Sequence, residues 1–390
     1  MTRAGKKIKV LSIFGTRPEA IKMAPVVREL QRRPEVVECR VVVTAQHREM
    51  LDQVLHTFAL EPDYDLALMR PGQDLFDITG AVLQGLKGVL ERERPDFILV
   101  QGDTTTTFAG ALAAFYFQIP IGHVEAGLRT REKYAPFPEE INRVLTSHLA
   151  DLHFAPTETA RNFLLKEGIS EKNIFITGNP VIDALHLALG RPCRLEPDLA
   201  RPFEENRRVI LLTTHRRENL GEPLREVYLA LRQLLDRYRD LGVLFPVHKN
   251  PKVRREVARI LAGVERIYFT EPLDYLPFLN VMKRASLVLT DSGGIQEEAP
   301  ALGKPVLVLR DVTERPEALK AGTARLVGTD RTRVEAEVAR LLEDEKAYGE
   351  MASAVNPYGD GQAAPRIVQA VLSYFGLAPV PADFSPALLK

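Results

Sequence analysis

The sequence predicts an α/β protein made of two doubly wound, Rossmann-like domains that face each other across a cleft. Short β-prone runs alternate with longer amphipathic helical patterns, and the alternation begins again after a proline-rich stretch near the middle of the chain. This alternation favours parallel sheets with helices on both faces. Because ligands of such sheets bind beyond the carboxyl ends of the strands, two facing domains form a cleft lined by strand-to-helix loops.

The first domain is expected at residues 1–189. Its β-prone runs predict strands at residues 8–14, 39–44, 97–101, 119–124, 152–155 and 174–177. Apolar residues at helical spacing predict helices at residues 18–33, 74–94, 104–117 and 139–149.

The second domain is expected at residues 203–362, after a linker at residues 190–202 that has three prolines and no periodicity. Its predicted strands are residues 208–213, 243–247, 266–269, 286–289, 306–309 and 324–327. The tail, residues 363–390, has one more helical pattern at 363–374. The sequence leaves open whether this helix packs back on the first domain.

Composition limits the classes of partner. The chain has 390 residues, more than one core usually supports, and 52 basic residues balance 52 acidic ones. A net charge of zero provides no general attraction for nucleic acid or anionic lipid, so an anionic ligand must be held locally. We expect neither nucleic acid nor a membrane as partner.

Cysteine content and apolar runs indicate the compartment. Cys39 and Cys193 are too few for a disulfide framework or a cysteine metal site. The first apolar run, residues 8–14, lacks the features of a signal peptide, and no stretch approaches the roughly 20 apolar residues of a membrane span. These features predict a cytoplasmic protein.

A strand-to-helix turn at residues 290–298 (TDSGGIQEE) is typical of a nucleotide site. Ser292, Gly293 and Gly294 lie at the turn, where backbone N–H groups and the helix dipole favour an anion. Glu298, one turn further on, is placed to accept hydrogen bonds from ribose hydroxyls. The alternative is an ordinary glycine-rich turn, because an isolated glycine motif is weak evidence.

Cations follow the first strand of each domain. Arg17 and Lys22 begin the first helix, where they are poorly placed unless an anion joins them, or they are ordinary exposed cations. His215 and Arg216 follow the strand at 208–213 and suit a phosphate grip or an acid/base site, although a lone histidine more often packs in a core. His248 also follows a strand and carries weaker evidence.

Carboxylates occupy the equivalent loops of the first domain. Asp103 ends a strand, where it is either functional or the N-cap of the next helix. Glu125 lies in an apolar, glycine-lined run, where a charge is costly unless it is paired or used. Glu139 begins a helix, which the dipole favours whatever the function. Together these three indicate proton transfers on a group attached to a nucleoside diphosphate.

Other chemistries are disfavoured. The sequence has no His-x-x-x-His pattern, no cysteine pair and no Walker-type Gly-Lys-Ser/Thr signature. Metal-dependent hydrolysis and P-loop ATPase chemistry are therefore not expected, and no metal is required.

Six segments in order resemble the bacterial non-hydrolysing UDP-N-acetylglucosamine 2-epimerases. They are residues 15–19 (GTRPE), 101–104 (QGDT), 125–129 (EAGLR), 138–143 (PEEINR), 214–219 (THRREN) and 290–298 (TDSGGIQEE). The resemblance implies a GT-B-like fold, a homodimer, and interconversion of UDP-GlcNAc and UDP-ManNAc without a cofactor. It further implies elimination of UDP to 2-acetamidoglucal and re-addition.

The resemblance also implies roles for particular residues. The acid/base candidates are Asp103, Glu125 and Glu139, with His215 in support. The residues expected to hold the UDP-sugar are Arg17, Lys22, Arg143, Arg216, Phe278, Ser292, Gly293, Gly294 and Glu298. A second, activating UDP-GlcNAc corresponds to Gln46, Arg216 and His248, but this chain has Glu49 and Gly72 where activated members have Gln and Arg.

Three other functions stay open at this point. A retaining GT-B glycosyltransferase shares the fold but needs an acceptor sugar, and a hydrolysing relative releases free ManNAc and UDP. A non-catalytic UDP-sugar-binding regulator leaves the nucleotide sugar unchanged.

Overall fold

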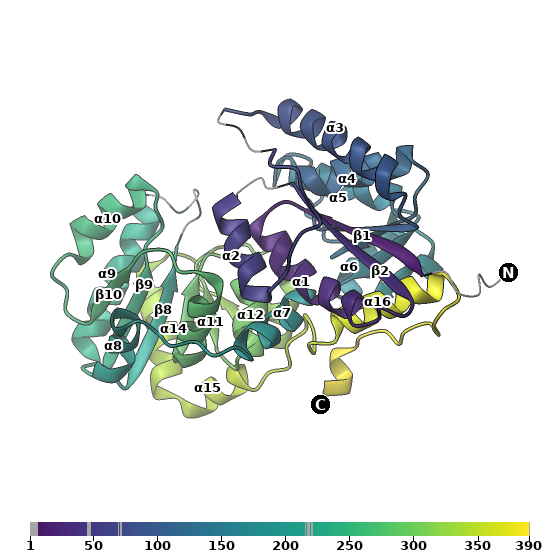
Figure 1. Ribbon diagram of the computed structural model, residues 1–390. Coiled ribbons are helices and arrows are strands. Elements are labelled where there is room, and N and C mark those ends of the chain that lie inside the picture. Colours follow the sequence, from purple (N-terminus) through teal and green to yellow (C-terminus); the bar gives the residue numbers. More distant parts are fainter. Residues whose placement is uncertain are drawn as a thin grey trace. The chain divides into compact units, whose positions relative to one another are not determined.

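The computed structural model describes residues 7–44, 48–68, 70, 72–214, 216, 219 and 221–389. The chain forms two compact units (Figure 1). Unit 1 comprises Met1–Ala188 and Tyr358–Leu389, and unit 2 comprises Leu189–Pro357.

The described residues of unit 1 form a seven-stranded parallel sheet in the order β3-β2-β1-β4-β5-β6-β7. The strands are β1 (Ile8–Phe14), β2 (Val37–Val43), β3 (Tyr64–Asp65), β4 (Phe97–Gln101), β5 (Ile121–Val124), β6 (Leu152–Ala155) and β7 (Ile174–Ile176). The helices are α1 (Arg17–Gln31), α2 (Arg48–Phe58), α3 (Leu75–Glu93), α4 (Thr105–Tyr116), α5 (Glu139–Leu149), α6 (Glu158–Lys166), α7 (Pro180–Leu189) and α16 (Ala363–Tyr374), with 3-10 turns at Glu171–Asn173 and Pro386–Leu389.

The described residues of unit 2 form a six-stranded parallel sheet in the order β10-β9-β8-β11-β12-β13. Its strands are β8 (Arg208–Thr213), β9 (Leu241–Pro246), β10 (Ile267–Thr270), β11 (Leu287–Thr290), β12 (Val306–Val308) and β13 (Ala324–Leu326). Its helices are α8 (Pro197–Glu205), α9 (Glu222–Arg237), α10 (Pro251–Leu261), α11 (Tyr275–Arg284), α12 (Ile295–Ala301), α13 (Pro316–Ala321), α14 (Arg331–Glu343) and α15 (Glu345–Ala352). Two doubly wound α/β units confirm the predicted fold class.

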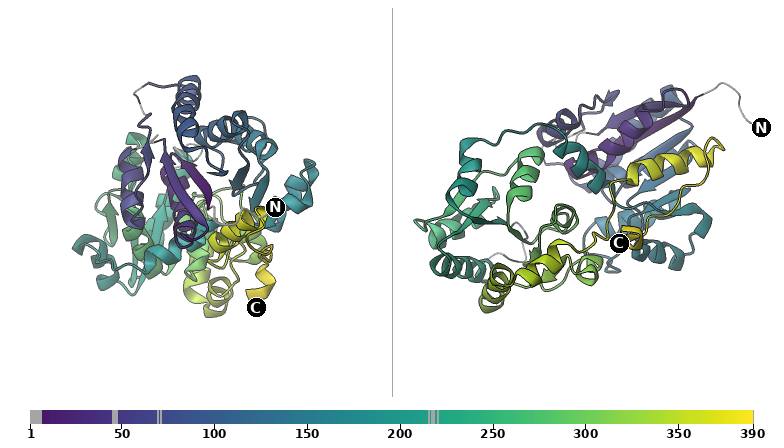
Figure 2. Two further views of the ribbon diagram at one scale, coloured as in Figure 1. Left: turned by 45° about the vertical axis from the view of Figure 1, so that its right-hand side comes forward. Right: turned by 90° about the horizontal axis from the view of Figure 1, so that it is seen from below.

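Helices cover both faces of the unit 1 sheet, which explains why its strands are apolar throughout. In β1, every side chain except that of Lys9 is buried. On one face α1 contacts α2 and α16, and on the other α3 and α5 flank α4 (Figures 1 and 2). A strand covered on both sides loses the alternating pattern of a half-exposed one.

Helix α1 begins with a capping box. The Thr16 side chain accepts from the Glu19 N–H, and the Glu19 carboxylate accepts from the Thr16 N–H, while Pro18 occupies the first turn. This arrangement satisfies N–H groups that have no partner inside the helix and fixes where the chain leaves β1.

The C-terminal segment returns to unit 1, where α16 packs on α1. Its N-terminus is held by Asp183 of α7, which accepts from the N–H groups of Ala363 and Ala364 at 3.2 and 2.9 Å. Burial raises the pKa of Asp183 to about 6. The helix N-terminus partly compensates the cost of burying this carboxylate.

Two local features differ from the sequence analysis. Residues 197–202, expected within the linker, begin helix α8 instead. Pro197 lies in the first turn of α8, where a missing N–H removes no intrahelical bond, whereas Pro202 lies inside the helix and gives up one such bond. Strand β3 was not predicted, because its two residues are too few to produce a periodic pattern.

Candidate active site

Several of the predicted motifs lie at the point in each sheet where the strand order reverses. In unit 1, β1 pairs with β4, and in unit 2, β8 pairs with β11, with Thr213 opposite Thr290. Chain segments leave this point toward opposite edges of the sheet and open a crevice at the strands' carboxyl ends. Each unit therefore presents two motif-bearing turns side by side.

The turn after β1 is packed against its neighbours. A Cβ atom on Gly15 would lie 2.0 Å from Thr44 Oγ1 and 2.7 Å from Thr106 Oγ1, so the position requires glycine. The two threonine hydroxyls are themselves hydrogen bonded at 2.9 Å. The turn places half-buried Arg17 at the start of α1.

Glu125 follows β5 with a buried side chain and a left-handed backbone, φ +63°. Its carboxylate lies 2.6 Å from Lys22 Nζ and accepts from Gln101 Nε2 at 2.5 Å and Asn179 Nδ2 at 2.9 Å. A non-glycine residue in this backbone region costs on the order of 1–3 kcal/mol and persists only where its surroundings fix it. The three donors hold Glu125 in this conformation and offset the free-energy cost of burying its charge.

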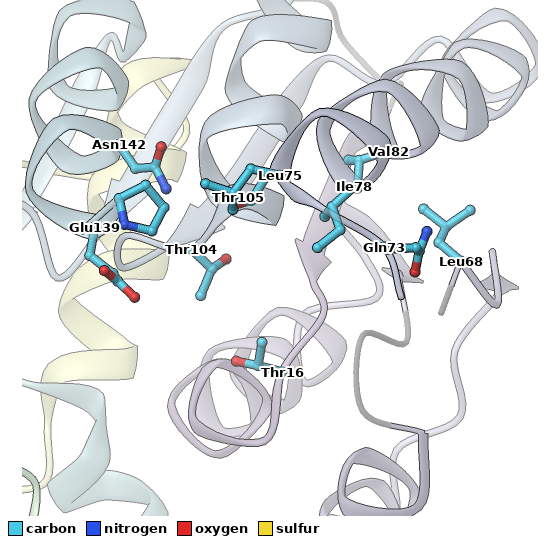
Figure 3. Close-up of a pocket in the computed structure, with 11 residues that line it drawn as sticks. Thr16, Leu68, Gln73, Leu75, Ile78, Val82, Thr104, Thr105, Glu139 and Asn142 are labelled. Carbon is cyan, nitrogen blue, oxygen red and sulfur yellow. The ribbon is translucent and has the colours of Figure 1, made fainter. Parts of the chain in front are cut away.

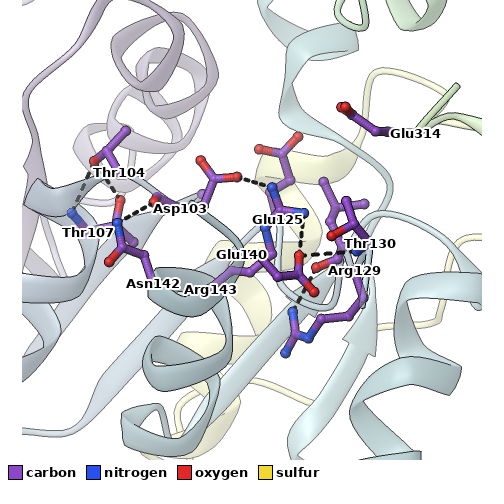
Figure 4. Close-up of polar contacts among 12 residues, drawn as sticks. Asp103, Thr104, Thr107, Glu125, Arg129, Thr130, Glu140, Asn142, Arg143 and Glu314 are labelled. Carbon is purple, nitrogen blue, oxygen red and sulfur yellow. Dashed lines mark hydrogen bonds and ion pairs between the residues drawn. The ribbon is translucent and has the colours of Figure 1, made fainter. Parts of the chain in front are cut away.

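Asp103 is not a helix cap. The N-cap of α4 is Thr104, whose hydroxyl accepts from the Thr107 N–H at 3.2 Å. The Asp103 carboxylate instead lies 2.5 Å from Arg143 Nη2, and its backbone carbonyl accepts from Asn142 Nδ2 at 3.0 Å (Figure 4). Both partners project from α5, which therefore orients the turn after β4.

The two acids at the start of α5 have different surroundings. Glu140 is buried and accepts from the N–H groups of Thr130 and Arg131, and it lies 3.3 Å from Arg143 Nη1 (Figure 4). Glu140 thus anchors the loop between β5 and α5. Its neighbour Glu139 faces a pocket.

That pocket has a volume of about 290 Å³ and lies wholly in unit 1 (Figure 3). Its lining residues are Thr16, Leu68, Gln73, Leu75, Ile78, Val82, Thr104, Thr105, Pro138, Glu139 and Asn142. Among the described residues, the buried Oε2 atom of Glu139 has no hydrogen-bond partner. An unsatisfied buried carboxylate oxygen is costly, so the position favours a ligand that donates a hydrogen bond to it.

Buried His123 in β5 supports the turn before Asp103. Its Nε2 atom lies 2.7 Å from the Gly102 carbonyl oxygen and therefore carries the hydrogen. Burial lowers the pKa of His123 to about 4, which keeps the ring neutral near pH 7. The neutral ring is therefore suited to act as a fixed donor to the Gly102 carbonyl.

In unit 2, the turn after β11 leaves space for a ligand. A Cβ atom added to Gly293 or Gly294 would meet nothing within 4 Å. The Ser292 N–H is already used, because it donates to Thr290 Oγ1 at 2.9 Å. Within the described ranges, the N–H groups of Gly293 and Gly294 have no hydrogen-bond acceptor, so these two are the anion donors that the turn offers.

Asp291 joins this turn to the one after β8. Its Oδ2 atom accepts from the Arg216 N–H at 2.9 Å and lies 3.4 Å from Asn219 Nδ2. The buried Nε atom of Arg216 has no hydrogen-bond partner among the residues that the structure describes. The Arg216 side chain is half-buried and is suited to an anion.

The remaining candidates of unit 2 lie on nearby elements. Buried Glu298 in α12 accepts from the Tyr275 hydroxyl at 2.8 Å, and half-buried Phe278 lies one turn after Tyr275 in α11. His248 is exposed after β9, where its Nδ1 atom accepts from the Asn250 N–H at 3.2 Å.

Two candidates, His215 and Gln46, lie outside the described residues. Across the part of the chain that the structure describes, no three His, Cys, Asp or Glu side chains are grouped to hold a metal ion. The same part contains no helix that is long and apolar enough to span a membrane.

The chain matches a known enzyme family along most of its length. A family model described as UDP-N-acetylglucosamine 2-epimerase matches residues 28–372. The chain belongs to this family. The six-motif resemblance is therefore confirmed, and so is the GT-B-like fold class.

Named relatives match along almost their whole length. The UDP-N-acetylglucosamine 2-epimerase of Salmonella typhimurium is 56% identical over 373 residues, covering 94% of this chain and 99% of the relative. A solved epimerase from Neisseria meningitidis bound to UDP-GlcNAc is 49% identical with a TM-score of 0.86, covering 94% of this chain and all of the other. The structure of S. aureus MnaA with UDP is 50% identical with a TM-score of 0.87, covering 97% and 100%.

The sequence patterns did not reveal several residues that organise this candidate site. They are Glu19, Gln101, Asn142, Asn179 and Asp291. Gln101 and Asp291 end or follow strands inside motifs that were already singled out, so their positions were a usable signal. Asn179 follows β7 and reaches Glu125 from 54 residues away, which no local pattern indicates.

The Lys22–Glu125 pair yields a stability test. Lys22→Met leaves the Glu125 charge buried without its cation, so we expect the free energy of unfolding to fall by about 3 kcal/mol in urea denaturation. The double variant Lys22→Met/Glu125→Gln should recover most of this loss, because no charge then remains buried.

Lys87→Met is the matched control, since Lys87 is exposed on α3. It should change the free energy of unfolding by less than about 0.5 kcal/mol. An equally small effect of Lys22→Met would contradict the pairing.

Proposed function

We propose that this protein interconverts UDP-N-acetylglucosamine and UDP-N-acetylmannosamine without net hydrolysis and without a cofactor. The product would supply activated ManNAc for cell-surface polysaccharide synthesis. The protein would act in the cytoplasm as a homodimer. Family membership and the ligands of the solved relatives, UDP-GlcNAc and UDP, support the choice of substrate.

One observation carries the proposal: unit 1 gathers three carboxylates in three different electrostatic settings. Glu125 is saturated by donors, Asp103 is paired with Arg143 yet keeps 30% of its side chain exposed, and Glu139 has a buried oxygen without a partner. Simple binding of a neutral sugar does not call for such a set, whereas proton transfers at two faces of a ring do.

The reaction explains why acids and bases are needed. C2 of the sugar has no adjacent carbonyl, so direct removal of its proton is very unfavourable. In an elimination, the C2–H electrons form the C1=C2 double bond while the C1–O electrons leave with UDP. Re-addition of UDP at C1, with protonation of C2 from the opposite face, gives the epimer and restores every atom.

The geometry favours a division of roles. Asp103 and Glu139 are the proton-transfer candidates, because each has carboxylate capacity left for a ligand. Glu125, whose oxygens accept from three donors, is better suited to orienting the site through Lys22. His215 would assist the departing diphosphate or a proton transfer.

The nucleotide would be held by groups that suit an anion. In unit 2, Arg216 and the N–H groups of Gly293 and Gly294 would bind the diphosphate, and in unit 1, Arg17 is a candidate for the same role. Further contacts would come from Ser292, Phe278 against the uracil, Glu298 at the ribose, and Lys22 and Arg143 as supporting charges.

The first test is product analysis. Pure protein incubated with UDP-GlcNAc alone should form UDP-ManNAc until a constant ratio is reached, as followed by anion-exchange chromatography, and the same ratio should be reached from UDP-ManNAc. Free ManNAc with UDP would indicate the hydrolysing reaction. No change without an acceptor sugar would favour a transferase, and no change under any condition would favour a binding role.

The second test addresses the carboxylates. Asp103→Asn and Glu139→Gln should each lower kcat by about 100-fold to 10,000-fold while UDP affinity, measured by calorimetry, stays within about 3-fold. Glu125→Gln should also lower kcat, because it loosens Lys22. Glu158→Gln on α6 is the control, since its side chain is exposed and pairs only locally with Arg161. Unchanged turnover in all three site variants would refute the assignment.

A further inference from the structure

Glu19 is a buried carboxylate that the proposed reaction does not use. It lies in the first turn of α1 and is 2% exposed. Its Oε2 atom accepts from the N–H groups of Gly15 and Thr16 at 3.2 and 2.8 Å. Its Oε1 atom accepts from the Thr104 hydroxyl at 2.8 Å and lies 3.2 Å from Thr107 Oγ1.

Helix capping explains only half of these contacts. The Oε2 contacts complete the capping box of α1, and the box of α3 at Asp74 and Asp77 is built in the same way. Asp77 is exposed, and within the part of the chain that the structure describes its hydrogen bonds join it to Asp74 alone. The Oε1 contacts of Glu19 are additional, since they reach the turn after β4, 85 and 88 residues along the chain.

Those contacts join the two turns at the switch point of unit 1. One turn holds Arg17 and the other holds Asp103, which directly precedes Thr104. The turns are also packed tightly, because Gly15 leaves no room for a Cβ atom beside Thr106. A shift of either turn would therefore break the hydrogen bonds to Glu19.

Unit 2 uses the same device at its own switch point. Buried Asp291 follows β11 and accepts from the Arg216 N–H in the turn after β8. The hydroxyls of Thr213 and Thr290 pair across the same two strands at 2.6 Å. A buried carboxylate that spans the two turns thus occurs independently in each unit.

We propose that Glu19 is a positioning residue for the epimerisation. Its carboxylate forms a brace, which holds the Arg17 turn and the Asp103 turn in one fixed arrangement. The inference rests on the proposed function, because that function gives the two turns their roles in binding and proton transfer. Among the described residues, the hydrogen bonds of Glu19 go to Gly15, Thr16 and two threonines, and not to the side chain of Arg17 or Asp103. Its effect on the reaction would therefore pass through the positions of the two turns.

The test compares removal with conservative replacement. Glu19→Ala should lower kcat by about 100-fold with KM changed less than about 3-fold, because a displacement of about 1 Å is enough to misalign a proton-transfer group. Glu19→Gln should stay within about 3-fold of the natural enzyme. Its oxygen can serve Gly15 and Thr16 while its amide donates to the threonine hydroxyls, which rotate to accept. Burial raises the pKa of Glu19, and the amide of Glu19→Gln removes the cost of burying a charge.

Asp77→Ala is the matched control, because it removes a capping-box carboxylate that joins no second turn. It should leave kcat within about 2-fold of the natural enzyme. Thr104→Val and Thr104→Ser address the brace from its other side and keep the test valid if Glu19→Ala does not fold. Thr104→Val, which removes the hydroxyl, should reproduce the loss in kcat, and Thr104→Ser should retain activity.

Amide hydrogen exchange provides a readout that does not depend on the reaction. Glu19→Ala, or Thr104→Val in its place, should accelerate exchange in residues 12–20 and 101–108, whereas Asp77→Ala should not. Unchanged exchange in residues 101–108 would overturn the brace whatever the protein catalyses. Accelerated exchange with unaltered kcat would overturn the positioning role. A natural enzyme that fails to epimerise would refute the proposed function, while the exchange data would still judge the brace.

Discussion

The organisation of unit 1 depends on the ion pair and hydrogen bonds of the buried Glu125 carboxylate. Its partners Lys22, Gln101 and Asn179 come from α1, the end of β4 and the segment after β7, so one buried charge joins the carboxyl ends of β4, β5 and β7 to helix α1. Burying a carboxylate is tolerable only when donors surround it, and removing any donor leaves part of that cost uncompensated. The left-handed backbone at Glu125 persists for the same reason. The arrangement of the site is therefore tied to the stability of the sheet end that supports it.

A second constraint acts on the turns themselves. In a doubly wound sheet, a ligand binds where neighbouring connections diverge, which is also where the backbone has least support from regular structure. Each unit meets this difficulty with a buried carboxylate that spans both turns, Glu19 in one and Asp291 in the other. Their neighbours Arg17, Asp103 and Arg216 are the residues proposed to act on the nucleotide sugar. Pre-organised groups of this kind reduce the rearrangement required when charge develops on a departing diphosphate.

The sequence predicted the fold class and most strand positions because parallel strands covered on both faces are apolar throughout, and that pattern is local. It also placed Asp103, Glu125, Arg17 and the glycines of the unit 2 turn at strand ends. It did not reveal what these residues contact: Asp103 pairs with Arg143 and is not a cap, and Ser292 uses its N–H within the turn. The partners of Asp103 and Glu125, such as Arg143 and Asn179, come from distant segments that only the folded chain brings together, whereas the Ser292 contact depends on the local geometry of its turn. The start of α8 was missed because Pro197 suits a first turn only once the helix boundary is known, and because Pro202 lies inside the helix, where proline is unfavourable.

The central claim is that a protein carboxyl group removes the C2 proton of UDP-GlcNAc and a different one returns a proton to the opposite face. Proton NMR of UDP-GlcNAc incubated with the enzyme in deuterated water tests this claim most directly. The account predicts that UDP-ManNAc grows in with deuterium at C2 and that the C2 proton signal of the remaining UDP-GlcNAc disappears. UDP-ManNAc that retains its original C2 hydrogen would contradict the account. The hydrogen would then have reached the opposite face without exchange with the solvent, which removal by one carboxyl group and protonation by another does not allow.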